Sequence, residues 1–146
     1  MLACDCNTNP DAPSEPFFPG AYQAYLLLKN AGFVDAFRTT RPTDPGFTFG
    51  QAEDLLNVTS TMSHRIDLVQ FRGAFTVKDV QVVGAGPADR ARVGLWPSDH
   101  ARVVATLTLP ICRAPGARHT TSSAASLRNL RYIMSHRSNP QSLNLR

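Results

Sequence analysis

Alternating hydrophobic and polar positions predict a series of β-strands in the second half of the chain. Residues 65–71, 74–83 and 102–109 are rich in β-branched and aliphatic side chains, and a glycine or a proline lies close behind each segment. Along the first segment, Asp67 falls on the same face as the apolar Val69. A carboxylate among apolar side chains is costly unless it has a partner, so we expect Asp67 to be hydrogen-bonded or ion-paired.

The first half of the chain predicts a short strand, a helix and long loops. Residues 1–7 open with an apolar run, and residues 8–20 contain four prolines, which are typical of a loop. Over residues 21–31 the apolar and aromatic side chains recur at helical spacing, and a glycine directly after them ends the helix. Residues 33–37 predict a turn or a second short helix, and residues 38–50 another loop.

Composition adds the size and the broad class of protein. The 146 residues, 42% of them hydrophobic and 18% charged, suffice for one globular domain with a hydrophobic core. No apolar run approaches the length of a membrane span, so we expect none, and residues 1–30 lack the pattern of a secretory signal.

The net charge of +4 comes from the last part of the chain. Residues 112–146 hold six arginines and no acidic residue, whereas residues 1–111 hold nine Lys and Arg against eleven Asp and Glu. We therefore divide the chain into a globular part, residues 1–111, and a basic tail, residues 112–146. The polar composition of the tail predicts disorder, with a short helix around residues 124–134, and favours a solvated extension over a nucleic-acid-binding arm.

The three cysteines, Cys4, Cys6 and Cys112, do not have the pattern of a disulfide framework. In an extended strand Cys4 and Cys6 would share one face, which is a poor geometry for a bond between them. A Cys-x-Cys pair also occurs in metal sites, but no second pair at a matching spacing follows. We therefore expect small buried side chains at these positions.

The tripeptide Ser98-Asp99-His100 places an acid and an imidazole where a loop enters the strand predicted over residues 102–109. The strand fixes the backbone while the loop leaves the side chains accessible, which suits a functional site. An ordinary polar turn is the alternative for this stretch taken alone. Trp96 is expected to pack the loop that presents Asp99.

Four short motifs stand in a fixed order along the chain. They are Asp5-Cys6-Asn7, Phe47-Thr48-Phe49, Arg65-Ile66-Asp67 and Ser98-Asp99-His100. In order and spacing they resemble the second half of the endonuclease/exonuclease/phosphatase superfamily, the deoxyribonuclease-I-like metal-dependent phosphoesterases. The resemblance covers residues 1–111 and implies an α+β fold: half of a four-layer α/β/β/α sandwich, with one mainly antiparallel sheet and one or two helices, followed by the disordered tail.

The resemblance implies a role for five side chains. Asp5 resembles the acid that orients or deprotonates the attacking water, and Asn7 the amide that holds a phosphate oxygen. His100 resembles the imidazole that lies against the scissile phosphate, and Asp67 the carboxylate that orients this imidazole. Asp99 and Asp5 resemble acids close to the metal, which the family implies to be Mg²⁺ or Mn²⁺. These residue types suit phosphoester hydrolysis, which needs a hard cation, donors for developing negative charge and a positioned base.

One part of this interpretation is geometric. A carboxylate behind a histidine fixes the tautomer of the imidazole and raises its pKa. We therefore expect the side chains of Asp67 and His100 to lie within about 4 Å of each other.

The chain also departs from the family pattern. Cys4 stands where the family has Gly, and Cys6 where a bulky apolar residue is common. The first half of the family fold, with its metal-binding glutamate, has no counterpart in the sequence, so we expect one face of the sheet to be uncovered. The predicted function is hydrolysis of a phosphodiester or phosphomonoester, incomplete and inactive in this chain alone. The alternative is a noncatalytic interaction module or decayed fragment that associates with itself or a partner through the exposed sheet.

Overall fold

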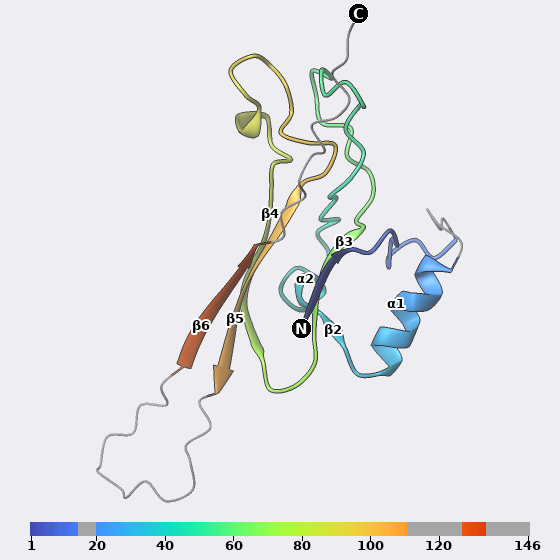
Figure 1. Cartoon of the computed structure of the whole chain (residues 1–146), viewed down its shortest axis with the longest axis vertical. Helices are drawn as coiled ribbons and strands as arrows, with labels where there is room; N and C mark the ends of the chain where they lie inside the picture. Colours follow the sequence, from blue (N-terminus) through green and yellow to red (C-terminus); the bar gives the residue numbers. More distant parts are fainter. Residues whose placement is uncertain (15–19, 111–126, 134–146) are drawn as a thin grey trace, which may run out of the picture.

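The computed structural model describes residues 1–14, 20–110 and 127–133, and it has an α+β fold with two antiparallel sheets and few helices (Figure 1). The first sheet has the strand order β1-β3-β2, and the second the order β4-β5-β6. The strands are β1 (Leu2–Asp5), β2 (Val34–Asp35), β3 (Asp67–Phe71), β4 (Thr76–Val83), β5 (Arg102–Pro110) and β6 (Leu127–Ile133). The helices are α1 (Ala21–Asn30), α2 (Ala36–Thr40) and the 3₁₀ turn η1 (Pro87–Asp89).

The elements predicted from periodicity form close to their expected places. Helix α1 ends at Asn30, and Gly32 behind it has a φ of +84°, which glycine adopts readily. Strands β3, β4 and β5 lie within the three segments predicted from alternation, apart from the last residue of β5, which is Pro110. Residues 33–37, predicted as a turn or a second short helix, contain β2 and the start of α2.

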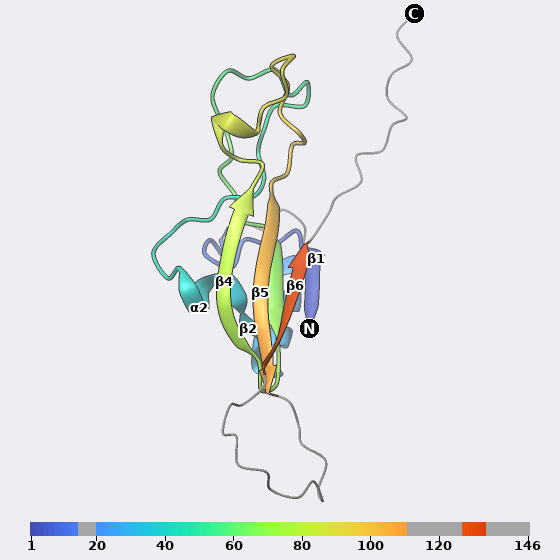
Figure 2. The ribbon, with the colours of Figure 1, turned by 90° about the vertical axis from the view of Figure 1, so that its left-hand side faces the viewer.

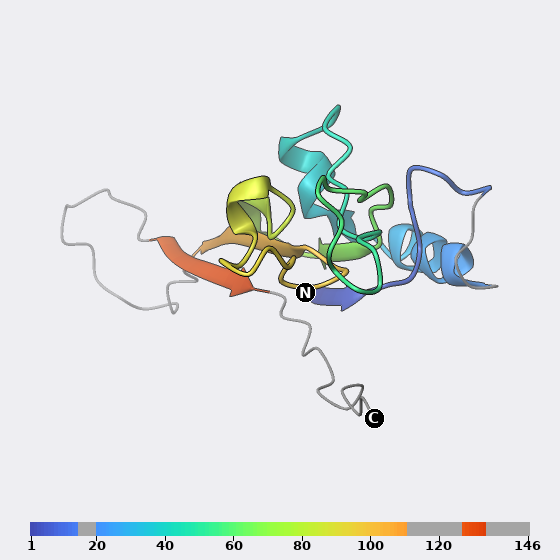
Figure 3. The ribbon, with the colours of Figure 1, turned by 90° about the horizontal axis from the view of Figure 1, so that it is seen from above.

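A single hydrophobic core joins the two sheets. It combines side chains of α2 with side chains of β3, β4 and β5: Ala36, Phe37, Val69, Phe71, Val80, Val103, Ala105 and Leu107. Figure 3 shows α2 on one side of the row of strands, and Figure 2 shows β4, β5 and β6 side by side in the second sheet. Because α2 covers residues of both sheets, it holds them in a fixed relation to each other.

Helix α1 contributes little to this core. None of its residues is buried, and a cavity of about 240 Å³ separates it from β1 and β3. Tyr25 and Leu28 of the helix face Leu2 and Leu68 of the strands across this cavity. Figure 3 shows α1 lying beyond β1, away from the core.

Two local predictions are wrong. The helix predicted around residues 124–134 is replaced over Leu127–Ile133 by strand β6, which pairs antiparallel with β5 from Val104↔Ile133 to Pro110↔Leu127. The open edge of β5 offers backbone partners that no local pattern reveals, and pairing with it determines the conformation. The other tail residues and Cys112 lie outside the described residues.

The second error concerns Cys4 and Cys6, which form a disulfide. Our prediction assumed that the strand continues through both cysteines, which would separate their Cα atoms by about 6.7 Å. Strand β1 ends at Asp5, and the chain turns so that the Cα–Cα distance is 5.0 Å, which is shorter than in an extended strand and brings the two side chains together.

Of the helices in the described part of the chain, none is both long and apolar enough to span a membrane.

Candidate active site

The side chains of Asp67 and His100 form a partly buried pair. His100 Nδ1 lies 2.9 Å from Asp67 Oδ2, and the two side chains are 12% and 0% exposed. Asp67 is the first residue of β3, and His100 lies just before β5. The predicted proximity of these two residues is therefore confirmed, across 33 positions of sequence.

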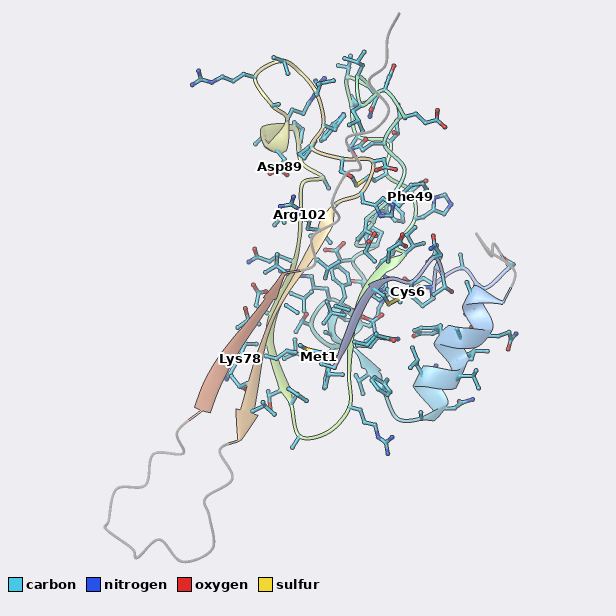
Figure 4. The ribbon with its side chains drawn as sticks, in the orientation of Figure 1. Met1, Cys6, Phe49, Lys78, Asp89 and Arg102 are labelled. Carbon is cyan, nitrogen blue, oxygen red and sulfur yellow. A yellow bond between two sulfur atoms is a disulfide. The ribbon has the colours of Figure 1, made fainter. Side chains whose placement is uncertain are left out.

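Asp5 joins this pair from the neighbouring strand. In the antiparallel pairing of β1 with β3, Asp5 stands directly opposite Asp67. One potential ligand atom from each of Asp5, Asp67 and His100 lies within 4.8 Å of the others. Figure 4 labels Cys6, the residue after Asp5, and Phe49, which contacts the His100 ring.

Asn7 is held beside the site through its backbone. The Asn7 N–H donates to Asp5 Oδ1 at 3.1 Å, and Asn7 has a φ of +48°, a left-handed conformation that asparagine tolerates better than most residues. In a strand that continued through residue 7, the side chains of Asp5 and Asn7 would project on the same side. The strand ends at Asp5 instead, and the turn after it makes the Asp5 carboxylate the acceptor for Asn7.

Asp99 occupies a more exposed position than the other acids. The Ser98 hydroxyl donates to Asp99 Oδ1 at 3.0 Å and accepts the backbone N–H of His100 at 3.1 Å. In the part of the chain that the structure describes, Asp99 does not belong to the close group of potential metal ligands, which consists of Asp5, Asp67 and His100. The predicted metal ligands Asp5 and Asp99 are thus not brought together in that group, whereas Asp5 and Asp67 are.

The site raises the pKa of His100 above its ordinary value. The hydrogen bond that the His100 ring N–H donates to the Asp67 carboxylate is the largest cause of the raised pKa, and it outweighs the opposing effect of burial. The negative charges of Asp67, Asp5 and Asp99 act in the same direction. The charged imidazolium is therefore favoured.

The donors in this group fit a divalent cation. Asp67 Oδ2 contacts His100, while Asp67 Oδ1 is buried and has no hydrogen-bond partner among the described residues. A buried carboxylate oxygen normally has a partner, so this atom points to an ion or a water molecule. Carboxylate oxygens are ligands that Mg²⁺ and Mn²⁺ accept.

Two segments that the sequence singled out support the loop around His100. The ring centroid of Phe49 lies 4.7 Å from that of His100, and the backbone of Phe49 bridges to both His64 and His100. Trp96 is buried, and its indole N–H donates to the Asn57 carbonyl at 2.8 Å. The prediction that Trp96 packs this loop is confirmed.

Sequence reasoning missed a cluster of charges at the start of β3. Arg65 is 2% exposed, and its guanidinium binds Asp11 Oδ2 at 2.8 Å and Asp35 Oδ2 at 2.7 Å. Asp35 also caps α2 by accepting the Phe37 N–H at 3.0 Å. Asp11 lies in the proline-rich loop, where no local signal could identify its partner.

Comparison of the chain with protein-family models, with curated proteins and with solved structures finds no match.

Proposed function

We propose that this chain carries part of the active site of a metal-dependent phosphoesterase, of the kind found in the endonuclease/exonuclease/phosphatase superfamily. The observation that carries the proposal is the hydrogen-bonded Asp67–His100 pair with Asp5 beside it. These residues come from three separate motifs, which the chain presents in the order that the resemblance requires. A chance polar turn at Ser98-Asp99-His100 would not need a buried acid from another strand behind its histidine.

The arrangement suggests a division of labour around a phosphate group. His100, whose protonated form Asp67 favours, would donate a hydrogen bond to the phosphate and balance the negative charge that develops on its oxygens. Asp5 would accept a proton from the attacking water or orient it. Asn7, held by Asp5 through its backbone, would place its amide against a phosphate oxygen.

We propose Mg²⁺ or Mn²⁺ as the metal, held by Asp5 and by Asp67 Oδ1, the buried oxygen that has no hydrogen-bond partner among the described residues. Such a cation supplies a Lewis acid for the phosphate and lowers the pKa of a bound water. Asp99 lies at the exposed rim of the loop, and its role as a further ligand stays a prediction. Its charge already favours the protonated form of His100.

The resemblance also implies elements that these 146 residues do not contain, among them a metal-binding glutamate. The sequence predicted one sheet where the structure has two three-stranded sheets, and we propose that the two together form the β layer of one half of a four-layer α/β/β/α sandwich. In that arrangement, the other half would complete the metal site and cover apolar surface. We therefore expect the chain alone to have little or no activity. The substrate is a phosphate ester of a class that the loops do not identify.

The test combines metal binding with hydrolysis. Electron paramagnetic resonance can measure the binding of Mn²⁺ to the purified chain. This binding should be lost in Asp67→Asn. Hydrolysis of bis(p-nitrophenyl) phosphate and p-nitrophenyl phosphate should be slow, should stop with a chelator, and should fall by about 10²–10⁴-fold in His100→Ala. His64→Ala is the matched control, because His64 also lies near Phe49 but is outside the Asp5–Asp67–His100 group. Hydrolysis that survives both the chelator and His100→Ala contradicts the proposal.

The alternative function, association through an exposed surface, is favoured by one observation. Seven large hydrophobic side chains in the described residues are at least 40% exposed: Met1, Leu27, Val34, Phe47, Leu56, Val58 and Val93. A noncatalytic module would bind its partner or itself with equal strength in the wild type and in His100→Ala. Sedimentation velocity over a wide range of protein concentration would detect self-association and separate it from the enzymatic proposal.

A further inference from the structure

The two members of the Asp67–His100 pair stand on different sheets. Asp67 begins β3 in the first sheet, and His100 precedes β5 in the second. Within the described residues, β3 and β5 are not neighbours in either sheet, so strand pairing does not fix the distance between their ends. Another element must set the 2.9 Å separation between His100 Nδ1 and Asp67 Oδ2.

Thr48 contacts the backbone next to both residues. Its hydroxyl oxygen accepts the N–H groups of Ile66 and Asp67, each at 3.1 Å. Its carbonyl accepts the N–H of Ala101, the residue after His100, at 2.7 Å. Thr48 is 0% exposed, so these bonds form without competition from solvent.

The residues around Thr48 strengthen the same connection. The N–H groups of Thr48 and Phe49 donate to the His64 carbonyl at 2.8 and 3.0 Å. On the other side, the N–H groups of Gly50 and Gln51 donate to the Asp99 carbonyl at 3.2 and 3.4 Å. Residues 48–51, the Thr48 segment, therefore connect the residues just before β3 with the loop just before β5.

We propose that Thr48 is a positioning residue that sets the geometry of the Asp67–His100 pair. Its hydroxyl oxygen accepts hydrogen bonds from two backbone N–H groups beside Asp67, and its carbonyl oxygen accepts one from the backbone N–H beside His100. The expected effect of Thr48 on catalysis rests on the proposed function. Its effect on the geometry of the Asp67–His100 pair does not depend on any activity. Valine has the same branched shape as threonine but no acceptor, so a valine at this position would leave the Ile66 and Asp67 N–H groups buried without that partner.

The experiment compares Thr48→Val, Thr48→Ser and Thr108→Val in the full chain by nuclear magnetic resonance. In Thr48→Val we expect the amides of Ile66 and Asp67 to exchange with solvent about tenfold faster or more, because each loses a buried hydrogen bond. The downfield Nδ1–H resonance of His100 should shift or disappear. Thr48→Ser keeps the hydroxyl and should retain both signals.

Thr108→Val is the matched control. Thr108 is also buried, but its hydroxyl donates to the Thr76 carbonyl in the second sheet, so the variant should leave the Ile66, Asp67 and His100 signals unchanged. A folded Thr48→Val protein with an unaltered His100 resonance overturns the proposal, and so does loss of that resonance in Thr48→Ser. If Thr48→Val does not fold, Thr48→Cys replaces it, because cysteine is close to threonine in size but is a weaker acceptor. This variant should show the same changes to a smaller degree, and unchanged signals would again overturn the proposal.

Kinetics then separate this inference from the proposed function. Where hydrolysis is measurable, Thr48→Val should lower kcat by about tenfold or more with little change in KM, because the substrate contacts are retained. An unchanged kcat contradicts a positioning role. If the resonance signals change as expected but the wild-type chain binds no Mn²⁺, the proposed function fails while the role of Thr48 in holding the pair stands.

Discussion

At the scale of single residues, the carboxylate of Asp67 has the most constrained surroundings. One oxygen binds His100, the other is buried without a hydrogen-bond partner among the described residues, and the backbone N–H of Asp67 is held by Thr48. Each of these contacts comes from a different part of the chain. The properties of His100 therefore depend on how accurately three segments meet.

The first prediction concerns the titration of His100. In metal-free buffer, its pKa should lie above the ordinary value near 6.5 in the wild type and should fall in Asp67→Asn, because the main cause of the raised pKa is removed. Titration of the ring protons by nuclear magnetic resonance measures both values. An equal pKa in the two proteins would contradict the pairing.

The same pairing has a consequence for stability. The pair with Asp67 raises the pKa of His100 in the folded state. The stabilisation by this pair is therefore fully present below the His100 pKa of the unfolded chain, and it is lost as the pH rises through the His100 pKa of the folded chain. The difference in unfolding free energy between wild type and Asp67→Asn should therefore be larger at pH 6 than at pH 9. Urea unfolding at the two pH values tests the sign.

At the scale of elements, the start of β3 is fixed by buried charges. The Arg65 guanidinium lies between the carboxylates of Asp11 and Asp35, and Asp35 also begins α2. Arg38 binds the same Asp11 carboxylate, and together the two arginines lower the pKa of Asp11 despite its partial burial, which acts in the opposite direction. This cluster ties the proline-rich loop, α2 and β3 together two residues before Asp67.

The second prediction follows from the burial of Arg65. Arg65→Met leaves the Asp35 carboxylate buried without its cation, and we expect the free energy of unfolding to fall by about 3–5 kcal/mol. The double variant Arg65→Met/Asp35→Asn removes the stranded charge, keeps a capping oxygen, and should recover part of the loss. Urea unfolding measures all three proteins.

The control for this prediction is the exposed pair Arg41–Asp79. Its side chains are 40% and 46% exposed, so Arg41→Met should cost less than about 1 kcal/mol. Equal losses in Arg65→Met and Arg41→Met would show that the buried cluster does not stabilise the start of β3 as we infer.

At the scale of the whole molecule, the two sheets share one core. Phe37 of α2 is 4% exposed and packs in the cluster that contains side chains of β3, β4 and β5. An element that covers both sheets makes their unfolding interdependent. The candidate site lies where the Thr48 segment connects the residues just before β3 with those just before β5. The site should therefore unfold together with the core.

The third prediction tests this cooperativity. Phe37→Ala should lower the free energy of unfolding by about 3–5 kcal/mol, because it empties a large volume between the sheets. Circular dichroism and the fluorescence of Trp96, the one tryptophan of the sequence, should give the same unfolding midpoint in the wild type and the same lower midpoint in Phe37→Ala. A separate early transition of the tryptophan signal would mean that the loop around the site unfolds independently of the core.

The sequence by itself determined the elements whose signals are local. Helix α1 and strands β3, β4 and β5 follow from side chains that repeat at spacings of two to four residues, and the backbone geometry fixes those spacings. The proximity of Asp67 and His100 was also predictable, because an acid on an apolar face needs a partner and the motif order supplied one. The wider interpretation as a phosphoesterase rests on that motif order and stays a prediction.

The tertiary structure alone decided the contacts between segments that are distant in sequence. The disulfide of Cys4 and Cys6 depends on where β1 ends, and β6 depends on the open edge of β5. The bridging role of Thr48 and the burial of Arg65 between Asp11 and Asp35 depend on how loops pack across two sheets. Such contacts leave no periodic pattern, because each is satisfied by a single partner whose position is set by the whole chain.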